Sequence, residues 1–382
     1  MRQGQLTNLN FLELEDRFCP SSFNLFSDGL GNVTIASDTS GAISVVASAP
    51  GLIDVFSSVP PASANLVFDD LPVLGNLTLR TGGLNDNIAV VLNPGASING
   101  DLTIDSGIGT DSVLLGGDAG STIGGNVSLR NANTVSVSGT GVFSIGGSIL
   151  VNSFQENDNS SFTLSNVFVG RDVSVQTGNG GDIVMLSGSV IGGSASAFLG
   201  NALTSQSFML DGSSVGGRLS VLTGNGDADA ITLTAASVGG PAYVNMFNGF
   251  GTNQFSFDAD SSIGGSLVLL GGSGTDQVNT FEGILAGNFY ANLGGGQNDL
   301  DFTGSSLFGT SISYFGGAGD DGILFEPATI SQARLFASLG AGADSVALNT
   351  SGLQGLFLDF GAGSDTFTQT VPLPLFAVVF NV

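Results

Sequence analysis

The segment Ser311–Phe325 reads SISYFGGAGDDGILF and shows the pattern that decides the fold. Apolar and polar residues alternate at its start, a glycine-rich turn follows, and the alternation resumes at Ile323. A period of two is typical of a β-strand, because successive side chains point to opposite faces. Similar blocks follow at 334–348 (RLFASLGAGADSVAL) and at 355–367 (GLFLDFGAGSDTF). The chain therefore contains a repeated strand–turn–strand unit.

The unit recurs along most of the chain. If the first apolar residue of each copy is taken as a marker, successive markers lie 21 to 25 residues apart. The 13 markers are Leu77, Leu102, Val127, Ile149, Val173, Ala195, Leu219, Ala242, Leu267, Phe289, Ile312, Leu335 and Leu356. A fixed period in this range is typical of a solenoid, and the Leu-x-x-Leu-x-Leu frame of leucine-rich repeats is absent.

Each copy is long enough for three short strands and three turns. The third strand ends in Ile-Gly-Gly or Val-Gly-Gly in several copies, as at 123–125. We therefore predict an all-β fold, a parallel β-helix (β-solenoid) of about 13 coils of roughly 23 residues. Right-handed crossovers are the rule for parallel strands, so we expect a right-handed β-helix. Since each coil buries its faces only against its neighbours, we expect one elongated domain.

The repeat divides the chain into four segments. Residues 1–23 lack the pattern, and we expect a tail or a short helix there. Residues 24–75 alternate irregularly and should form aberrant coils that cap the N-terminal end. Residues 76–370 should form the β-helix itself. Residues 371–382 contain two prolines, which block strand pairing, so we expect a C-terminal cap or, alternatively, a sorting or anchoring tail.

The charge inventory restricts the partners. The chain has 32 acidic residues, seven basic residues that are all arginine, no histidine and a formal net charge of −25. Such a charge repels nucleic acid and anionic lipid, so we exclude nucleic acid as a partner. The apolar run Leu375–Phe380 is far shorter than the roughly 18 residues of a membrane span, so no span is predicted. Cys19 is the only cysteine, so no internal disulfide forms.

One position is polar in every coil and lies two residues before the inward-facing pair of the second strand. Its occupants, which we call the slot residues, are Asp86, Asp111, Asn133, Ser160, Asp182, Gln206, Asp229, Asn253, Asp276, Asn298, Asp321, Asp344 and Asp365. Stacking of the coils should place these side chains in a column. One interpretation of the column is structural, because Asp and Asn cap turns by accepting backbone N–H bonds and Asn can form ladders from coil to coil.

The other interpretation of the column is calcium binding. The turn Gly-x-Gly-x-Asp followed by an alternating strand resembles one turn of the nonapeptide repeats of secreted β-roll proteins. That resemblance implies a few calcium sites between successive coils, with the candidate ligands Asp320, Asp321, Asp344 and Asp365. The β-roll proteins carry two nonapeptides in each coil, whereas this chain carries one. We expect no cofactor other than calcium.

A second resemblance concerns the N-terminus. The string Leu14-Glu-Asp-Arg17, followed by Pro20, is similar to the LEDR…P segment near the N-terminus of many exported or surface proteins of planctomycete bacteria. It implies an extracellular or cell-envelope location and implies no activity.

Enzymatic function is a further alternative, because many polysaccharide lyases and hydrolases are β-helices. A lyase needs a basic proton acceptor, and this chain has no lysine or histidine. A hydrolase needs two or three carboxylates in a cleft, which Asp301, Asp320 and Asp321 could supply. The coil lengths vary by only four residues, however, so no long loop builds a cleft wall. We therefore predict a non-enzymatic structural or adhesive protein without catalytic residues, with a cell-surface or polysaccharide partner; the oligomeric state is left open.

Overall fold

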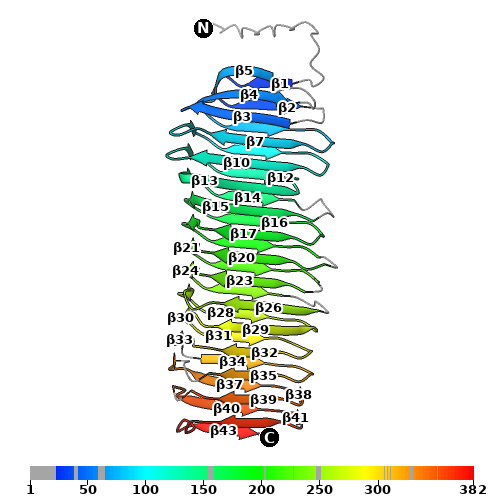
Figure 1. Ribbon diagram of the computed structural model, residues 1–382, viewed down its shortest axis with the longest axis vertical. Helices are drawn as coiled ribbons and strands as arrows, with labels where there is room; N and C mark the ends of the chain where they lie inside the picture. Colours follow the sequence, from blue (N-terminus) through cyan, green and yellow to red (C-terminus); the bar gives the residue numbers. More distant parts are fainter. Residues whose placement is uncertain are drawn as a thin grey trace, which may run out of the picture.

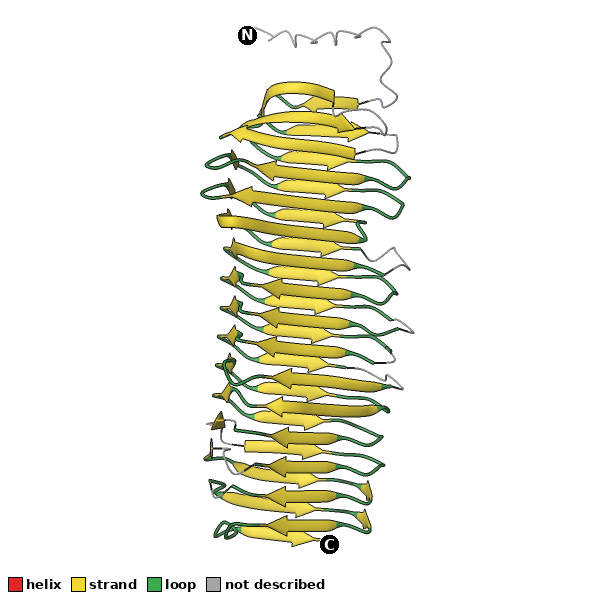
Figure 2. Ribbon diagram, viewed as in Figure 1, coloured by secondary structure: helices red, strands yellow, loops and turns green. Residues whose placement is uncertain are grey.

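The computed structural model describes residues 23–37, 42–58, 65–153, 159–201, 204–226, 228–246, 251–304, 306–307, 309, 311–326, 330–350 and 352–382. The described chain is all-β and winds into a tall stack of coils (Figure 1). Strands form its long walls and loops connect them (Figure 2). The predicted parallel β-solenoid is confirmed, while its handedness stays a prediction. The tail or helix expected before Phe23 lies outside the described residues. Within those residues, no helix is long and apolar enough to cross a membrane.

The first wall is a 16-stranded sheet, which we call sheet A. Its strands, in spatial order, are β1 (Phe23–Ser27), β2 (Val33–Ser37), β6 (Leu77–Arg80), β9 (Leu102–Asp105), β12 (Val127–Arg130), β14 (Ile149–Asn152), β16 (Val173–Gln176), β19 (Ala195–Phe198), β22 (Leu219–Leu222), β25 (Ala242–Asn245), β28 (Leu267–Leu270), β31 (Phe289–Asn292), β34 (Ser311–Phe315), β37 (Arg334–Ser338), β40 (Gly355–Asp359) and β43 (Ala377–Phe380). All neighbours are parallel except β1 and β2. The markers pair with one another, as Leu77 does with Leu102, so the period read from the sequence is the stacking register.

The second sheet, which we call sheet B, has 25 strands and contains the second and third strands of each coil. Its longer strands are β3 (Ala42–Ala49), β4 (Leu52–Ser58), β5 (Asn65–Pro72), β7 (Asn87–Leu92), β10 (Ser112–Asp118), β13 (Thr134–Ile145), β15 (Ser161–Val169), β17 (Ile183–Ser187), β20 (Ser207–Asp211), β23 (Ala230–Thr234), β26 (Thr252–Phe257), β29 (Thr275–Phe281), β32 (Asp299–Phe302), β35 (Gly322–Phe325), β39 (Ser345–Leu348) and β42 (Thr366–Gln369).

The third strand is short where it is separate, whereas β13 and β15 each combine the second and third strands of a coil. The separate third strands are β8 (Ser97–Ile98), β11 (Thr122–Ile123), β18 (Val190–Ile191), β21 (Ser214–Val215), β24 (Ser237–Val238), β27 (Ser262–Ile263), β30 (Ile284–Leu285), β33 (Ser306–Leu307) and β36 (Ile330–Ser331). A separate pair, β38 (Ala341–Gly342) with β41 (Ala362–Gly363), forms within the glycine-rich turns of the last coils.

The core lies between the sheets and consists of the inward half of each alternation. Every predicted inward pair is at most 2% exposed: Val113/Leu115, Val184/Leu186, Ile231/Leu233, Phe255/Phe257, Ile323/Phe325 and Val346/Leu348. In the C-terminal half the same positions hold phenylalanines whose rings contact one another from coil to coil, with 4.5 Å between the ring centroids of Phe302 and Phe325. The prediction of the core is therefore confirmed.

The N-terminal end differs from the aberrant coils that we expected. β2 and β3 pair parallel with the first regular coil, but β4 runs antiparallel to β3 and β5 runs antiparallel to β4. These antiparallel strands cover the edge of the stack at its N-terminal end (Figure 1). Alternation alone does not separate parallel from antiparallel pairing, so the sequence pattern missed this arrangement.

The C-terminal end also differs from the prediction. Residues 371–382 were expected to leave the repeat as a cap, yet β43 pairs parallel with β40 and continues sheet A. Pro372 and Pro374 lie in the connection before β43, and a proline blocks pairing only at its own position.

Candidate functional site

The slot residues form the predicted column inside the wall. Of the 13, all but Asp365 are buried; that last aspartate is half-buried. They lie where the glycine-rich turn from sheet A enters the strand of sheet B, so each side chain stacks on its counterpart in the next coil. An unpaired carboxylate in such a place would be costly, so the partners of each oxygen decide what the column does.

In nine of the 13 slot residues, a side-chain oxygen accepts the backbone N–H of the slot residue in the previous coil. The backbone N–H of Asp321 donates to Oδ1 of Asp344 at 2.9 Å, and the N–H of Asp344 donates to Oδ1 of Asp365 at 2.9 Å. The same bond runs from Asp86 to Asp111, Asp111 to Asn133, Ser160 to Asp182, Gln206 to Asp229, Asp229 to Asn253, Asp276 to Asn298 and Asn298 to Asp321. The column is therefore a ladder of side chain–backbone hydrogen bonds along the rod.

The second oxygen caps the turn of its own coil in two of these residues. Asp321 Oδ2 accepts the N–H of Gly317 at 3.2 Å, and Asp276 Oδ2 accepts the N–H of Gly272 at 3.0 Å. Asn298 adds a side-chain bond of 2.9 Å to Asp321 Oδ1. The turn passes so close to the carboxylate that a Cβ on Gly316 would collide with Asp321 Oδ2, which explains the glycines.

Burial shifts the titration of several slot carboxyls. Burial raises the pKa of Asp321 to about 7 and raises the pKa of Asp182 and of Asp276 to about 6, while hydrogen bonds oppose the shift. Burial also raises the pKa of Asp344, and the charges of Asp365 and Asp320 add to this shift. Its Oδ2 atom is buried and has no hydrogen-bond partner among the described residues.

The candidate calcium ligands do not gather into a cluster. Asp321, Asp344 and Asp365 use Oδ1 in the ladder, and Asp320, which is exposed in the turn, accepts the N–H of Ala343 at 2.8 Å. Oxygens that already accept N–H donors have fewer lone pairs left for a cation. The geometry therefore supports the structural interpretation of the column.

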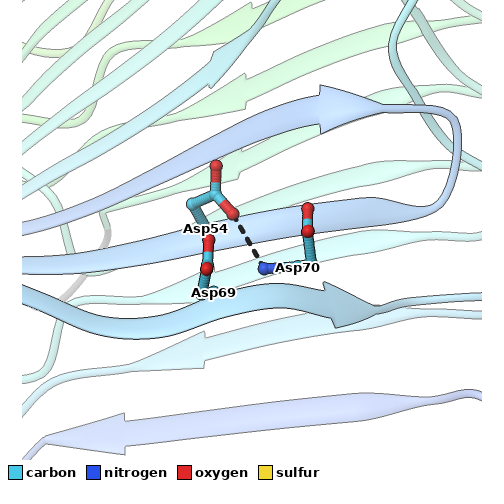
Figure 3. A group of neighbouring side chains, drawn as sticks. All are labelled: Asp54, Asp69 and Asp70. Carbon is cyan, nitrogen blue, oxygen red and sulfur yellow. Dashed lines mark hydrogen bonds between the residues drawn. The ribbon is translucent and has the colours of Figure 1, made fainter.

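A different group of carboxylates does gather, on the N-terminal cap. Asp54 of β4 and Asp69 and Asp70 of β5 place carboxylate oxygens within 4.8 Å of one another, and no other described residues form such a group of three or more. Figure 3 shows the three side chains on neighbouring strands and the bond of 2.9 Å from the N–H of Asp70 to Asp54 Oδ1. Sequence reasoning missed this group because the antiparallel pairing of β4 with β5 brings it together.

The carboxylates considered for hydrolysis lie in different settings. Asp321 is buried in the ladder, whereas Asp320 is exposed in the turn before it. Asp301 alternates with buried Leu300 and Phe302 on β32 and therefore points outward from sheet B. Burial raises the pKa of Asp301, and the charges of Asp299 and Glu326 add to this shift.

The outer face of sheet A carries the positive charges of the described residues, although these arginines lie in coils that are not adjacent. All five described arginines are exposed and lie on a strand of sheet A or within two residues before one: Arg80, Arg130, Arg171, Arg218 and Arg334. The acidic residues in equivalent positions are Asp101, Asp105, Asp172 and Asp359. This face is therefore close to neutral on a strongly acidic chain.

The same face carries a line of aromatic side chains in the C-terminal coils. Successive ring centroids lie 4.8 to 5.6 Å apart along Tyr290, Phe315, Phe336, Phe357 and Phe380. Two open grooves also lie here. One, of about 410 Å³, is lined by Arg218, Ser220, Pro241, Ala242, Tyr243, Ser266 and Val268. The other, of about 540 Å³, lies around Arg334 and Phe336.

Comparison with protein-family models, with curated proteins and with solved structures gives no match for this chain.

Proposed function

We propose that this chain is a non-enzymatic, acidic β-solenoid of the cell envelope or the extracellular space, with a structural or adhesive role. The observation that carries the proposal is the use of the repeated polar residues. The slot side chains accept backbone hydrogen bonds from coil to coil, so they hold the rod together. Residues held in this way are poor candidates for general acid–base work, which needs access to a substrate.

A partner can therefore contact only the outer surfaces of the rod. Among these, the outer face of sheet A carries several kinds of feature that a partner could bind. It combines exposed arginines with aromatic side chains and shallow grooves. We infer that this face contacts a cell-surface or polysaccharide partner. The net charge of −25 supports an extended, soluble rod that does not bind nucleic acid, and the resemblance of the N-terminal segment supports export.

Binding to isolated cell envelopes and to neutral and acidic polysaccharides, measured by co-sedimentation, tests the role. We expect the chain to sediment with at least one of them and to leave the polysaccharide chain length unchanged. A double variant of the first groove, Arg218→Ser with Tyr243→Ser, should reduce binding. A matched double variant on the outer face of sheet B, Met185→Ser with Met209→Ser, should bind like the parent. Release of shortened or unsaturated sugars would replace the adhesive role with an enzymatic one.

Calcium binding is a second candidate function, and the observation that favours it is the buried Oδ2 atom of Asp344. Asp344 Oδ2 is buried without a hydrogen-bond partner among the described residues, and Asp321 and Asp365 occupy the slot in the coils on either side. A cation at this position would relieve the repulsion between neighbouring carboxylates. A proton on Asp344 would have the same effect, so the two explanations differ in their response to calcium at constant pH.

A further inference from the structure

The outer face of sheet A over β34, β37, β40 and β43 carries a patch that we call the aromatic patch. It contains Arg334, Phe336, Phe357, Asp359, Phe376 and Phe380. Phe336, Phe380 and Phe376 are 39%, 47% and 73% exposed, so a large apolar surface faces solvent. The patch has one positive and one negative side chain, whereas the whole chain has a net charge of −25.

A groove of about 540 Å³ runs through this patch and has Gly355 in its floor. Gly355 has no side chain, and a Cβ placed there would lie 3.4 Å from Cγ of Arg334. The stem of Arg334 therefore forms one wall of the groove, and Phe376 of the next coil lies on the other side. Arg334 is the only charged side chain among the described residues of the lining, which otherwise consists of apolar residues with Ser311 and Gln354, so the groove suits a carboxylate on a small side chain.

The side chains of the patch are arranged symmetrically about the two central rings. Phe336 and Phe357 are paired in register on neighbouring strands and stack with 4.8 Å between centroids. Arg334 lies two residues before Phe336, and Asp359 lies two residues after Phe357. At about 3.3 Å of rise per residue, the two charges lie roughly 7 Å to either side of the ring line. Phe376 and Phe380 lie on the same two sides in the next strand.

A twofold axis parallel to the rod and above the ring line exchanges these two sides. The rotation places Asp359 of a second copy over the groove beside Arg334, and the symmetry makes the same contact a second time. It also places Phe376 of one copy opposite Phe380 of the other. Asp359 is held for such a contact, because its Oδ1 already accepts bonds from Gly361 N–H at 3.2 Å and from Asn381 Nδ2 at 2.8 Å.

We propose that two copies of this chain associate side by side and parallel through the aromatic patch, with Asp359 of each copy bound at Arg334 of the other. A glycan fits the patch less well, because the planes of Phe336 and Phe357 differ by only 8° and the rings cover each other's faces. The net charge of −25 repels an anionic membrane and also a second copy, so two copies can meet only through a nearly neutral surface such as this patch. This self-association goes beyond the adhesive role and does not depend on it.

The size of the patch sets the expected strength. Four strands at about 4.8 Å and five residues at about 3.3 Å span roughly 300 Å² on each copy, well below the about 800 Å² of a standard interface. A weak dimer is therefore expected, with a dissociation constant in the range of tens to hundreds of micromolar.

Sedimentation equilibrium from about 1 µM to about 1 mM tests the proposal, together with small-angle scattering of the associated species. The parent should dimerise, and the dimer should have nearly the maximum dimension of the monomer, because the rods lie side by side. Arg334→Asp and Phe336→Ser should each weaken dimerisation about tenfold or more. Arg334→Asp combined with Asp359→Arg should restore it, because both ion pairs form again with their charges exchanged. Arg80→Asp, the same charge change at the other end of sheet A, should dimerise like the parent.

Three results would overturn the proposal. They are a parent that stays monomeric up to about 1 mM, a dimer of twice the monomer's length, and a dimer that Arg334→Asp leaves unchanged. Asp359→Arg also removes the bonds to Gly361 and Asn381, so the melting temperature of each variant is measured as well. If the double variant does not fold, the proposal is still tested by comparing the dimerisation of Arg334→Asp and Phe336→Ser with that of the control Arg80→Asp.

Discussion

The backbone N–H of Asp321 donates a hydrogen bond of 2.9 Å to Oδ1 of Asp344, its counterpart in the next coil. The two carboxyls differ in their second oxygen. Asp321 Oδ2 accepts the N–H of Gly317, whereas Asp344 Oδ2 has no hydrogen-bond partner among the described residues. Two aspartates of one column therefore have different hydrogen-bond partners. Replacing the carboxylate with an amide should change the stability of the chain in opposite directions at the two positions.

Asp344→Asn should be at least as stable as the parent at pH 8. Asparagine keeps the oxygen that accepts the N–H of Asp321, and its neutral amide is less costly to bury than a charged carboxylate beside Asp365 and Asp320. Asp321→Asn should lose about 1–3 kcal/mol of unfolding free energy. Both oxygens of Asp321 accept N–H donors, so the NH₂ group that replaces one of them in asparagine faces another donor. Urea denaturation at equilibrium measures both variants.

Asp321→Ala and Asp344→Ala are the controls for the pair, since alanine removes both oxygens. Both should be destabilised, and Asp321→Ala more than Asp344→Ala, because it frees more donors. Equal stability of the two Asn variants would contradict the different roles that the hydrogen bonds assign to these carboxyls.

A charge in the core should be far more harmful than a charge on the adjacent outward position. Val346 is 1% exposed, and Ala347 alternates with it on β39 toward the outside. Val346→Asp should cost several kcal/mol of unfolding free energy, on the order of a buried unpaired charge. Ala347→Asp should change it by less than about 1 kcal/mol. Thermal and urea unfolding compare the two variants, and similar losses would show that the inward and outward faces are assigned wrongly.

The repeat, the inward pairs and the polar column could be predicted from the sequence, because each depends on a local alternation of apolar and polar residues that recurs in every coil. Val346 and Leu348 were predicted to face inward from their spacing alone, and both are buried. The capping interpretation of Asp321 followed from the chemistry of Asp in turns. The sequence did not show that the second carboxylate oxygen is hydrogen-bonded in Asp321 and, among the described residues, unpaired in Asp344, since both residues occupy the same position in the repeat.

Features that depend on pairing between coils were harder to predict. The repeat pattern did not group the arginines, because they lie in coils that are not adjacent, yet Arg218 and Arg334 precede or begin strands of the same sheet. Asp54, Asp69 and Asp70 meet only through the antiparallel pairing of β4 with β5. The expected block of strand pairing after residue 370 was wrong at β43, because the prolines precede the strand and do not interrupt it.

Calcium should stabilise the chain no more than an inert salt does. The net charge of −25 causes self-repulsion, so any salt should raise the melting temperature at low ionic strength. Calcium chloride and sodium chloride at equal ionic strength should therefore give equal melting temperatures. A specific site would add a further rise that follows RT ln(1 + [L]/Kd). A calcium-specific rise in the parent that disappears in Asp344→Asn would establish calcium binding at the column.

Stability should fall as the pH rises from about 5 to about 8. The folded pKa is raised to about 7 for Asp321 and to about 6 for Asp182 and Asp276, against 3.8 as the ordinary value. Between the ordinary and the folded pKa, the folded state binds more protons than the unfolded state, so the slope of unfolding free energy against pH is negative. The contribution is fully present below about pH 4 and is lost as the pH rises through 6 to 7.

The variant Asp182→Asn tests the titration of one buried carboxyl separately from the general repulsion among the negative charges of the chain. Asparagine keeps the oxygen that accepts the N–H of Ser160 at 2.8 Å and removes the titrating proton. At high, constant salt the melting temperature of Asp182→Asn should fall less steeply with pH than that of the parent. Asp260→Asn, which removes one exposed carboxylate, should follow the parent curve. A parent curve that is flat, or that rises between pH 5 and pH 8, would show that the buried column is ionised throughout this range and that its hydrogen bonds outweigh its burial.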